Sequence, residues 1–401
     1  MKICWVIDNK YRDLYGLYDL KKNLKQKNLD LCIINKYHWL YALKYFNPHY
    51  VIIPNIYKTS GLPILEFCIK NDIRVILYNV EGFHTDKKLL KLYFQKKYLK
   101  DLYKIYVWSP QEVKYLIKVG YPRSRIVLTG ALKLQTNKQK KFPKKIKKIG
   151  IISTNKFFSG RFVGDLSTPI MHHIYRKKPN KEDVKHTIGF MHYEIDFLNL
   201  IKNIIFATKK KYEFIVRPHP FEDSEFYVNP YFKLDQTINI HDFLNNVDVV
   251  LNHYSSASLD ALIYNVPTIS LEHLLKKSYK IEVLDNFFPK NLAYKPKNMN
   301  ELLFILNDKN FLSEYKKIHE KKFKKIMNKK HPIEDGITRI SNSFDFYKKN
   351  KKFNYFKSII MFAVYELYYF IKYNRDTAYK LYFKKDRKLL KEFSTQKNNG
   401  K

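Results

Sequence analysis

The chain has 401 residues, 45% of them hydrophobic, and a formal net charge of +38 from 75 Lys and Arg residues against 37 Asp and Glu residues. This length predicts two domains of ordinary size or one large one, and the hydrophobic content is enough for full cores. Cys4, Cys32 and Cys68 form no CxxC or Cys/His metal spacing, which argues against a disulfide framework or structural zinc and fits a reducing cytoplasm.

The large positive net charge has two possible explanations. One is an anionic partner such as nucleic acid, an acidic glycan or a lipid surface. The other is a coding bias, because Lys, Asn, Ile, Tyr and Phe are all abundant and the lysines are spread along most of the chain.

The first 130 residues alternate short apolar runs with segments of helix length. The strands are expected at 2–8, 29–35, 50–55, 74–79, 104–109 and 125–130. Continuous apolar runs are typical of strands buried on both faces, so this rhythm predicts a parallel sheet covered by helices. Met1 leads directly into the first of these strands, and no signal peptide is visible.

A polar, basic stretch at 133–148 then predicts a linker between domains. A second alternation follows: an irregular insertion is expected at 155–190, and helices dominate from 298 onward. The expected strands here are 149–154, 212–220, 248–255 and 266–271, with helices at 193–211, 241–247 and 256–265.

This pattern predicts an α/β protein with two Rossmann-like domains that face a central cleft, followed by C-terminal helices. The first domain is expected at 1–132, the second at 149–345, and a basic aromatic tail at 346–401. Ligands of such sheets bind beyond the carboxyl ends of the strands. The chain contains no GxGxxG and no GxxxxGK[ST] motif, which argues against a dinucleotide oxidoreductase or a P-loop ATPase.

Three of the expected strand ends carry residues suited to chemistry. They are Glu81-Gly82, the segment Arg217-Pro218-His219-Pro220, and Ser255-Ser256. The two prolines hold His219 in an extended pose, where it can donate a proton or a hydrogen bond, although a rigid turn alone would look the same.

The other residues also have two readings each. Ser255 and Ser256 precede a helix and can cap it or bind phosphate, and Arg217 can bind an anion or hold the loop. Glu81 can act as a general base or be an ordinary loop residue. Together they suit the transfer of a group from a nucleotide-activated donor to a hydroxyl. No Asp-x-Asp motif lies near a strand end, so no metal is expected.

The order of an acidic residue with glycine, then His-Pro, then Ser-Ser resembles the motifs of bacterial sialyltransferases and related enzymes that use CMP-activated sugars. The opening segment is also similar to bacterial surface-carbohydrate biosynthesis proteins. The resemblance covers roughly residues 1–345 and rests on few specific residues. It implies the GT-B fold and a metal-independent, inverting glycosyltransferase without a cofactor, whose CMP-sugar is a substrate.

By this resemblance, Glu81 would activate the acceptor hydroxyl, His219 would protonate or hydrogen-bond the leaving phosphate, and Ser255 and Ser256 would hold that phosphate. Arg217 and Pro220 complete the expected donor site. The family pattern has two acidic residues before the glycine, and Val80 stands at the first of them, which leaves Glu81 as the sole candidate base.

A second family shares part of the pattern. "VRPHP", followed by "VDVVLNHYSSASLDALIYNVPTISL", also resembles the CDP-glycerol glycerophosphotransferases of teichoic acid assembly. Both families use cytidine nucleotides, so a cytidine donor is expected in either case. The Glu-Gly of the first domain favours a sugar transferase, and Kdo and nonulosonic acids such as sialic acid are the sugars usually activated as CMP.

The tail adds a further expectation. Residues 358–371 are apolar apart from Glu366 and are too short to span a bilayer. They predict either a helix on an anionic membrane surface or one that packs back on the domains. A membrane location would suit an enzyme that extends lipid-linked glycans. The resemblance implies a surface glycan, free or lipid-linked, as the acceptor, met in the cytoplasm or at the inner face of its membrane. No nucleic-acid recognition motif accompanies the charge.

Overall fold

A computed structural model describes most of the two expected domains. The described ranges are 1–7, 13–14, 16–36, 39–57, 60–80, 90–91, 93–132, 140–153, 181–208, 211–218, 230–235, 237, 240–252, 255, 257–275, 293–308, 310–327 and 335–346. Among them, no helix is long and apolar enough to cross a membrane.

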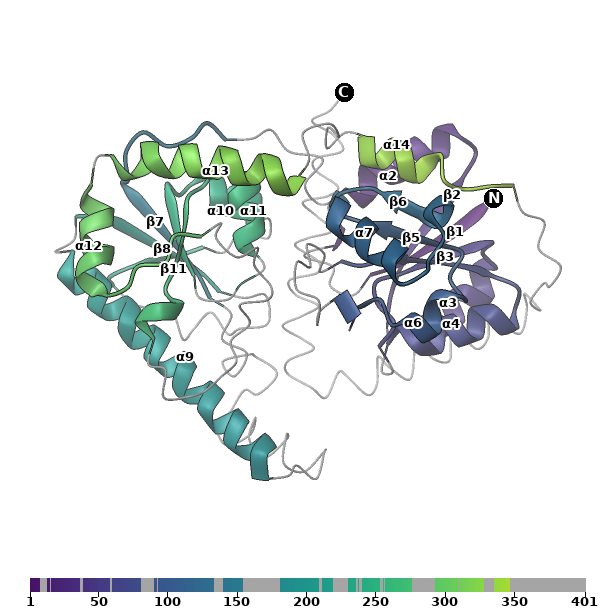
Figure 1. The fold of residues 1–401 in the computed structure, drawn as a ribbon, viewed down its shortest axis with the longest axis horizontal. Coiled ribbons are helices and arrows are strands. Elements are labelled where there is room, and N and C mark those ends of the chain that lie inside the picture. The colour runs from purple at the N-terminus through teal and green to yellow at the C-terminus, as the bar shows by residue number, and fades with distance from the viewer. Residues whose placement is uncertain are drawn as a thin grey trace. The chain divides into compact units, whose positions relative to one another are not determined.

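The chain divides into two compact units. Among the described residues, the first unit contains 1–132 and 318–346, and the second contains 140–275 and 293–317. Each unit is built on its own parallel sheet (Figure 1). The predicted α/β class with two Rossmann-like domains is therefore confirmed.

The first sheet has six parallel strands in the order β2-β1-β3-β4-β5-β6. They are β1 (Lys2–Ile7), β2 (Asp30–Asn35), β3 (Tyr50–Ile53), β4 (Arg74–Tyr78), β5 (Lys104–Val107) and β6 (Ile126–Leu128). All six predicted strands are present. Each is shorter than the predicted run: β2 begins one residue later, β6 is shorter at both ends, and the other four end earlier.

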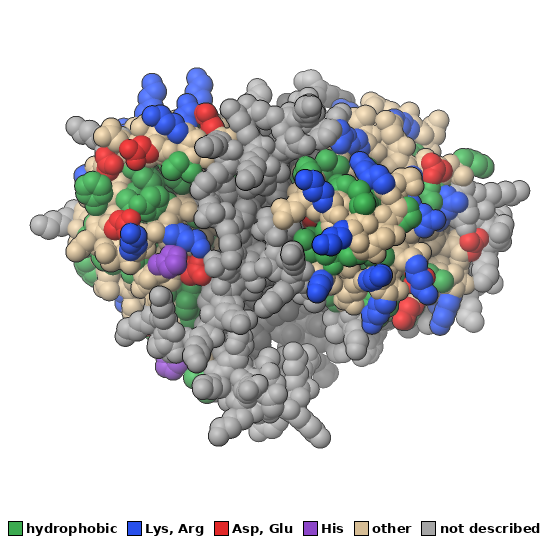
Figure 2. Space-filling view, viewed as in Figure 1, with side chains coloured by type: hydrophobic (Ala, Val, Ile, Leu, Met, Phe, Trp, Pro, Cys, Tyr) green, Lys and Arg blue, Asp and Glu red, His purple; other side chains and the backbone are tan. Residues whose placement is uncertain are grey.

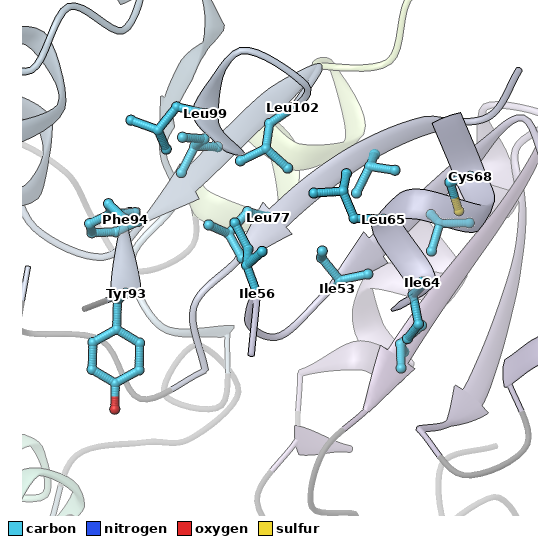
Figure 3. Close-up of a cluster of buried hydrophobic side chains, with 14 of the residues drawn as sticks. Ile53, Ile56, Ile64, Leu65, Cys68, Leu77, Tyr93, Phe94, Leu99 and Leu102 are labelled. Atoms are coloured by element: carbon cyan, nitrogen blue, oxygen red, sulfur yellow. The ribbon is translucent and has the colours of Figure 1, made fainter. Parts of the chain in front are cut away.

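Helices cover both faces of this sheet, with α2 and α14 above it and α3, α4 and α6 below it in the view of Figure 1. The bounds are α2 (Leu17–Gln26), α3 (Trp39–Phe46), α4 (Gly61–Lys70), α6 (Lys96–Leu99), α7 (Pro110–Lys118), the 3-10 turn η1 (Arg123–Arg125) and α14 (Asp335–Ser341). Figure 3 shows the core under α4, where Ile53 of β3 and Leu77 of β4 pack with Leu65 and Phe94.

A residue in the left-handed region ends several helices and turns the chain into the next strand. Asparagine and aspartate tolerate this conformation better than other side chains, and glycine adopts it freely. The residues are Asn28 after α2, Asn47 after α3, Asp72 after α4, Gly120 after α7 and Asn265 after α11, with φ between 50° and 88°. These turns lead the chain into β2, β3, β4, β6 and β11.

The second sheet has five parallel strands in the order β11-β10-β7-β8-β9. They are β7 (Lys148–Ile152), β8 (Glu213–Arg217), β9 (Lys233–Leu234), β10 (Val249–Asn252) and β11 (Thr268–Ser270). The two-residue strand β9 was not predicted, because it is too short to leave an apolar run in the sequence.

Two cores flank the second sheet. One lies between the sheet and α9 (Lys181–Ala207), α12 (Met299–Asn307) and α13 (Phe311–Met327). The other lies under α10 (Ile240–Asn245) and α11 (Ala257–Ile263), where a Cβ on Gly150 would meet Phe243 at 2.7 Å. The 3-10 turn η5 (Glu272–Leu274) follows β11.

Two predicted boundaries differ from the structure. Residues 155–190 were expected to be irregular, but α9 already begins at Lys181. From there to Ala207 the sequence has no proline, so no residue breaks the backbone hydrogen bonds of the helix. The second domain was expected to run to 345, but residues 318–346 belong to the first unit.

The chain returns to the first unit with α14 and the five residues that follow it. Arg339 of α14 donates to the carbonyl oxygen of Leu128 at 3.0 Å, and α14 packs on α2 and β6. Beyond it, the Tyr106 hydroxyl bonds the buried hydroxyl of Ser343 at 2.5 Å. The sequence carries no sign of this return, because its contacts join residues more than 200 positions apart.

Candidate functional site

The carboxyl end of β8 is held by Arg217. Its guanidinium forms a salt bridge with Asp235, and the two side chains are only 11% and 8% exposed. It also donates to the carbonyl oxygen and hydroxyl of Thr237 at 2.9 and 3.0 Å, and it lies 5.7 Å from the ring centre of Phe243. Arg217 therefore ties the chain after β9 to the end of β8, just before His219.

The carboxyl end of β10 is lined by small polar side chains. The Ser255 hydroxyl accepts from the backbone N–H of Ala257 at 3.2 Å, as expected of a residue that caps the start of α11. The amide nitrogen of Asn252 and the hydroxyl of Ser258 are both buried and form no hydrogen bond within the described ranges. A buried polar atom without a partner is costly, which marks both as candidates for ligand contacts.

These two strand ends lie close together at one edge of the second sheet. Strands β8 and β10 both pair with β7, so their ends are about 10 Å apart. The backbone N–H of Ser153, which follows β7, donates to the carbonyl oxygen of Arg217 at 3.0 Å. On the other side, the N–H of Leu271 donates to the carbonyl oxygen of Asn252 at 2.7 Å. A ligand of nucleotide size would reach both ends.

Packing between α10 and α11 supports this edge from one face. The rings of His241 and Tyr264 are stacked, 4.4 Å apart with an interplanar angle of 16°. Burial, with the carboxylates of Asp260 and Asp242 nearby, raises the pKa of the Tyr264 hydroxyl. Tyr264 therefore stays neutral at physiological pH and serves as a packing residue.

The carboxyl edge of the first sheet is filled by aromatic rings. Tyr78, the last residue of β4, lies 5.1 Å from Trp5 and 6.1 Å from Trp108, measured between ring centres. Its hydroxyl accepts from the backbone N–H of Leu132 at 2.9 Å. Burial raises the pKa of Tyr78, so this hydroxyl also stays protonated. The rings hold the end of β4, from which the chain runs on to Glu81.

One carboxyl group at this edge is fully buried. Glu112 in the first turn of α7 accepts from the backbone N–H groups of Trp108 and Ser109 at 2.9 and 2.8 Å, and the Ser109 hydroxyl accepts from the N–H of Glu112. These bonds form a capping box. Burial raises the pKa of Glu112 to about 7 against the stabilising effect of those donors.

The predicted site residues divide into two groups. Arg217 and Ser255 lie where they were predicted, at the ends of β8 and β10, and each already has a bond within the protein. Glu81, His219, Pro220 and Ser256 lie outside the described residues, so their roles remain predictions. Among the residues that the structure covers, no group of His, Cys, Asp and Glu could hold a metal ion.

The sequence interpretation missed Asn252, Ser258 and two further buried serines that follow strands, Ser153 and Ser270. A signal was present for three of them. The apolar runs of β7, β10 and β11 each end in one small polar residue, at Ser153, Asn252 and Ser270. Ser258 had no such signal, because a polar residue in a short helix looks the same whether it faces solvent or a sheet.

Comparison with known proteins defines the fold. No family model matches the sequence, and no curated protein matches it. A solved structure of the wall teichoic acid polymerase TagF aligns with a TM-score of 0.52 and 11% identity, over 85% of this chain and 87% of that one. A UDP-GlcNAc 2-epimerase from Neisseria meningitidis aligns with a TM-score of 0.50 and 11% identity, over 86% of this chain and 99% of that one.

These likenesses and the two parallel sheets place the chain in the GT-B fold, as predicted. At such low identity they establish the fold alone. No CMP-sugar transferase stands among these neighbours, so the resemblance to that family remains a prediction from the motifs.

Proposed function

We propose that this protein is a metal-independent, inverting glycosyltransferase that moves a sugar of the Kdo or nonulosonic acid type from a CMP-activated donor to a hydroxyl group. The acceptor is a bacterial surface glycan, free or lipid-linked, such as a lipopolysaccharide or capsule precursor. The reaction takes place in the cytoplasm or at the inner face of its membrane.

The arrangement of the second sheet carries this proposal. Arg217-Pro218, which leads into His219, and Asn252 with Ser255 lie at strand ends on either side of β7, about 10 Å apart. Small hydroxyl and amide groups at the carboxyl edge of a parallel sheet suit a nucleotide phosphate and ribose. The fold neighbours include an epimerase bound to UDP-GlcNAc and a polymerase soaked with CDPG, and both ligands are nucleotides.

In the proposed reaction, Glu81 takes the proton of the acceptor hydroxyl as its oxygen bonds to the anomeric carbon. The bond between that carbon and the CMP phosphate oxygen breaks, and its electron pair leaves with the phosphate. His219 donates a hydrogen bond or proton to this oxygen, and Ser255 and Ser256 bind the other phosphate oxygens. Attack from the face opposite the leaving group inverts the anomeric centre.

A second candidate is a glycerophosphotransferase that uses CDP-glycerol. Its support is the same segment, "VRPHP" with the Ser-Ser sequence, which resembles that family. Arg217 of this segment ends β8, and Ser255 lies between β10 and α11. The fold likeness to TagF is compatible with it. This candidate needs the second sheet but does not need Glu81.

A donor panel tests the proposal. Purified protein is incubated with CMP-Kdo, CMP-sialic acid, CDP-glycerol or UDP-GlcNAc, and release of the nucleotide is followed by chromatography. Release of CMP from either CMP-sugar, faster with a glycan acceptor than without, is the expected result. Turnover of CDP-glycerol alone would replace the proposal with the second candidate. Turnover of UDP-GlcNAc alone would contradict both.

A pair of variants tests the base. Glu81→Gln should lower turnover at least about a hundredfold, because proton removal by a positioned base contributes about that much or more. Glu66→Gln, an exposed carboxylate on α4, is the matched control and should keep full turnover. Full activity in Glu81→Gln would remove Glu81 from the mechanism.

A further inference from the structure

Three helices of the first unit end in the same way. Tyr45 follows Lys44 near the end of α3, and Ile69 and Ile117 precede Lys70 and Lys118 at the ends of α4 and α7. The three apolar side chains are 44%, 50% and 47% exposed. Each helix thus ends with a large apolar side chain in solvent beside a lysine.

These helix ends form a row along one edge of the sheet. α3 packs on β1 and β2, α4 on β3 and β4, and α7 on β5 and β6. Because each of the three leads toward the start of a strand, and all strands are parallel, their ends lie at the amino edge of the sheet. Helices packed side by side are about 10 Å apart. The rings of Trp39 in α3 and Phe67 in α4, 5.4 Å apart, show such a contact.

The row is strongly basic, and Figure 2 shows Lys and Arg side chains (blue) outnumbering acidic ones (red) on this unit. The exposed acidic side chains on these helices and the adjoining turns are Glu66 and Asp101, and Asp30 and Asp345 are also exposed at this edge. The exposed basic ones are Lys70, Lys91, Lys96, Lys97, Lys100, Lys114, Lys118, Arg123 and Arg125. We call the row of helix ends with Lys44, Lys70, Lys118 and the three apolar residues the amino-edge surface.

The described part of the chain also ends at this edge. The Tyr50 hydroxyl, at the start of β3, donates to the carbonyl oxygen of Asp345 at 2.5 Å, and the Tyr103 hydroxyl bonds its carboxylate. Lys104, at the start of β5, donates to the carbonyl oxygen of Ser343. Phe346 follows, 86% exposed. Phe346, the last described residue, therefore adds an exposed aromatic side chain next to residues of this edge.

We propose that the amino-edge surface docks on a lipid bilayer that contains anionic phospholipid. Lysines alone would suit any polyanion, but apolar side chains spaced between them favour a surface with both phosphate groups and a hydrocarbon interior. Tyrosine and isoleucine enter the interface while neighbouring lysines stay at the headgroups. This surface goes beyond the proposed function, because it depends on neither the donor nor the acceptor.

The docked orientation would set the carboxyl edge of the first sheet away from the bilayer. Strands of four to six residues span about 13 to 20 Å, so that edge would lie about that far above the bilayer surface. The amino-edge surface and the carboxyl edge are therefore at opposite ends of the strands.

Vesicle co-sedimentation of the full chain tests the proposal. Phosphatidylcholine vesicles with and without 30 mol% phosphatidylglycerol (about one anionic lipid in three) are compared. Two variants alter the surface: Y45S/I69S/I117S removes its apolar side chains, and K70E/K118E reverses its charge. The controls make the same kinds of change on α2, as Y18S and K21E/K22E, where Tyr18 is 58% exposed and both lysines are exposed.

The expected result is binding to anionic vesicles that falls at least about tenfold in both surface variants and less than about twofold in the controls. All these residues lie at the surface, so the thermal midpoints should stay unchanged. No binding by the natural chain, equal binding by surface variants and natural chain, or equal losses in the controls would each overturn the proposal. A loss in the charge variant alone, matched by weaker binding to soluble polyphosphate, would assign the surface to a polyanion instead.

Discussion

The carboxyl edges of the two sheets differ in what fills them. At the first edge, Tyr78 packs between Trp5 and Trp108, and Glu112 is used by a capping box. At the second edge the strands end in small polar residues, and the amide nitrogen of Asn252 is buried without a partner in the part of the chain that the structure describes. Each edge thus holds a buried polar atom without a partner among the described residues, Glu112 Oε1 at the first and Asn252 Nδ2 at the second. The two edges differ in what surrounds that atom, which is aromatic rings at the first edge and small polar side chains at the second.

This difference suggests a division of work within one fold. An aromatic support holds the end of β4, three residues before Glu81 in the sequence, which suits a base that must meet an acceptor hydroxyl. Small hydroxyl and amide groups suit a donor phosphate and ribose, whose many oxygens need several partners.

The largest effect is expected at the second edge. His219→Ala should lower turnover by about a hundredfold to ten-thousandfold, because the leaving phosphate loses its proton or hydrogen-bond donor. The matched control is His49→Asn at the amino edge of the first sheet, where the new side chain can still accept from the N–H of Lys2 as His49 does at 3.1 Å. Steady-state kinetics measures both. Equal losses in the two variants would mean that His219 acts through folding only.

The next effect concerns pH at the first edge. Burial raises the pKa of Glu112 from 4.5 to about 7, so between these values the folded state keeps a proton that the unfolded state has lost. Stability from this group is therefore complete below about pH 4.5 and falls as the pH rises to about 7, by about 3 kcal/mol.

Glu112→Gln cannot titrate and can still serve in a capping box. The advantage in thermal midpoint of the natural protein over this variant should therefore shrink steadily from pH 5 to pH 7 and stay constant above pH 8. Glu66→Gln is the exposed control and should run parallel to the natural protein. A parallel profile for Glu112→Gln would show that Glu112 is ionised at low pH in the folded state.

A smaller effect is expected from the aromatic support. Tyr78→Phe leaves the buried N–H of Leu132 without its acceptor and should cost about 2 kcal/mol, seen as a drop of a few degrees in thermal midpoint. Tyr18→Phe, at an exposed tyrosine of α2, should change nothing. Nucleotide binding should stay normal in both. A loss of nucleotide affinity in Tyr78→Phe would contradict the division between the two edges.

The smallest change in stability is expected when a serine that caps a helix is replaced by alanine. Ser255→Ala and Ser109→Ala each remove a side chain that accepts from a helix N–H, and each should cost about 1 kcal/mol. Only Ser255→Ala should also weaken nucleotide binding, by about tenfold, because a hydrogen bond to a charged phosphate is worth about 1.5 kcal/mol or more. Calorimetric titration distinguishes them. Equal nucleotide affinities in the two variants would mean that Ser255 caps the helix and does not bind the nucleotide.

Much of the fold could be predicted from periodicity. The strands at Lys2–Ile7 and Val249–Asn252 are continuous apolar runs, and burial on both faces demands such runs. Strand β9 could not be predicted, since its two residues leave no local apolar signature. The early start of α9 at Lys181 was missed although Val184, Ile188 and Met191 follow helical spacing. The return of residues 335–346 to the first unit depends on pairs such as Arg339 and Leu128, which are distant in sequence.

The candidate site was predictable only in part. Arg217 and Ser255 follow apolar runs, which announces a strand end, but their bonds to Asp235 and Ala257 come from the fold. The burial of Asn252 depends on the helices that cover β10, and no local pattern reveals it. The motifs thus indicated which edge of the sheet holds the candidate site. Tertiary packing decides which side chains at that edge have hydrogen-bond partners.

The most direct test of the central claim is a thermal-shift panel with CMP, CDP, UMP, UDP and GDP on the natural protein and on Ser255→Ala. A nucleotide at one hundred times its dissociation constant adds about 2.7 kcal/mol, which should raise the midpoint by several degrees. A clear shift with CMP or CDP that shrinks in Ser255→Ala is the predicted result. No shift with any nucleotide, or one only with uridine or guanine nucleotides, would contradict a cytidine donor at the second edge.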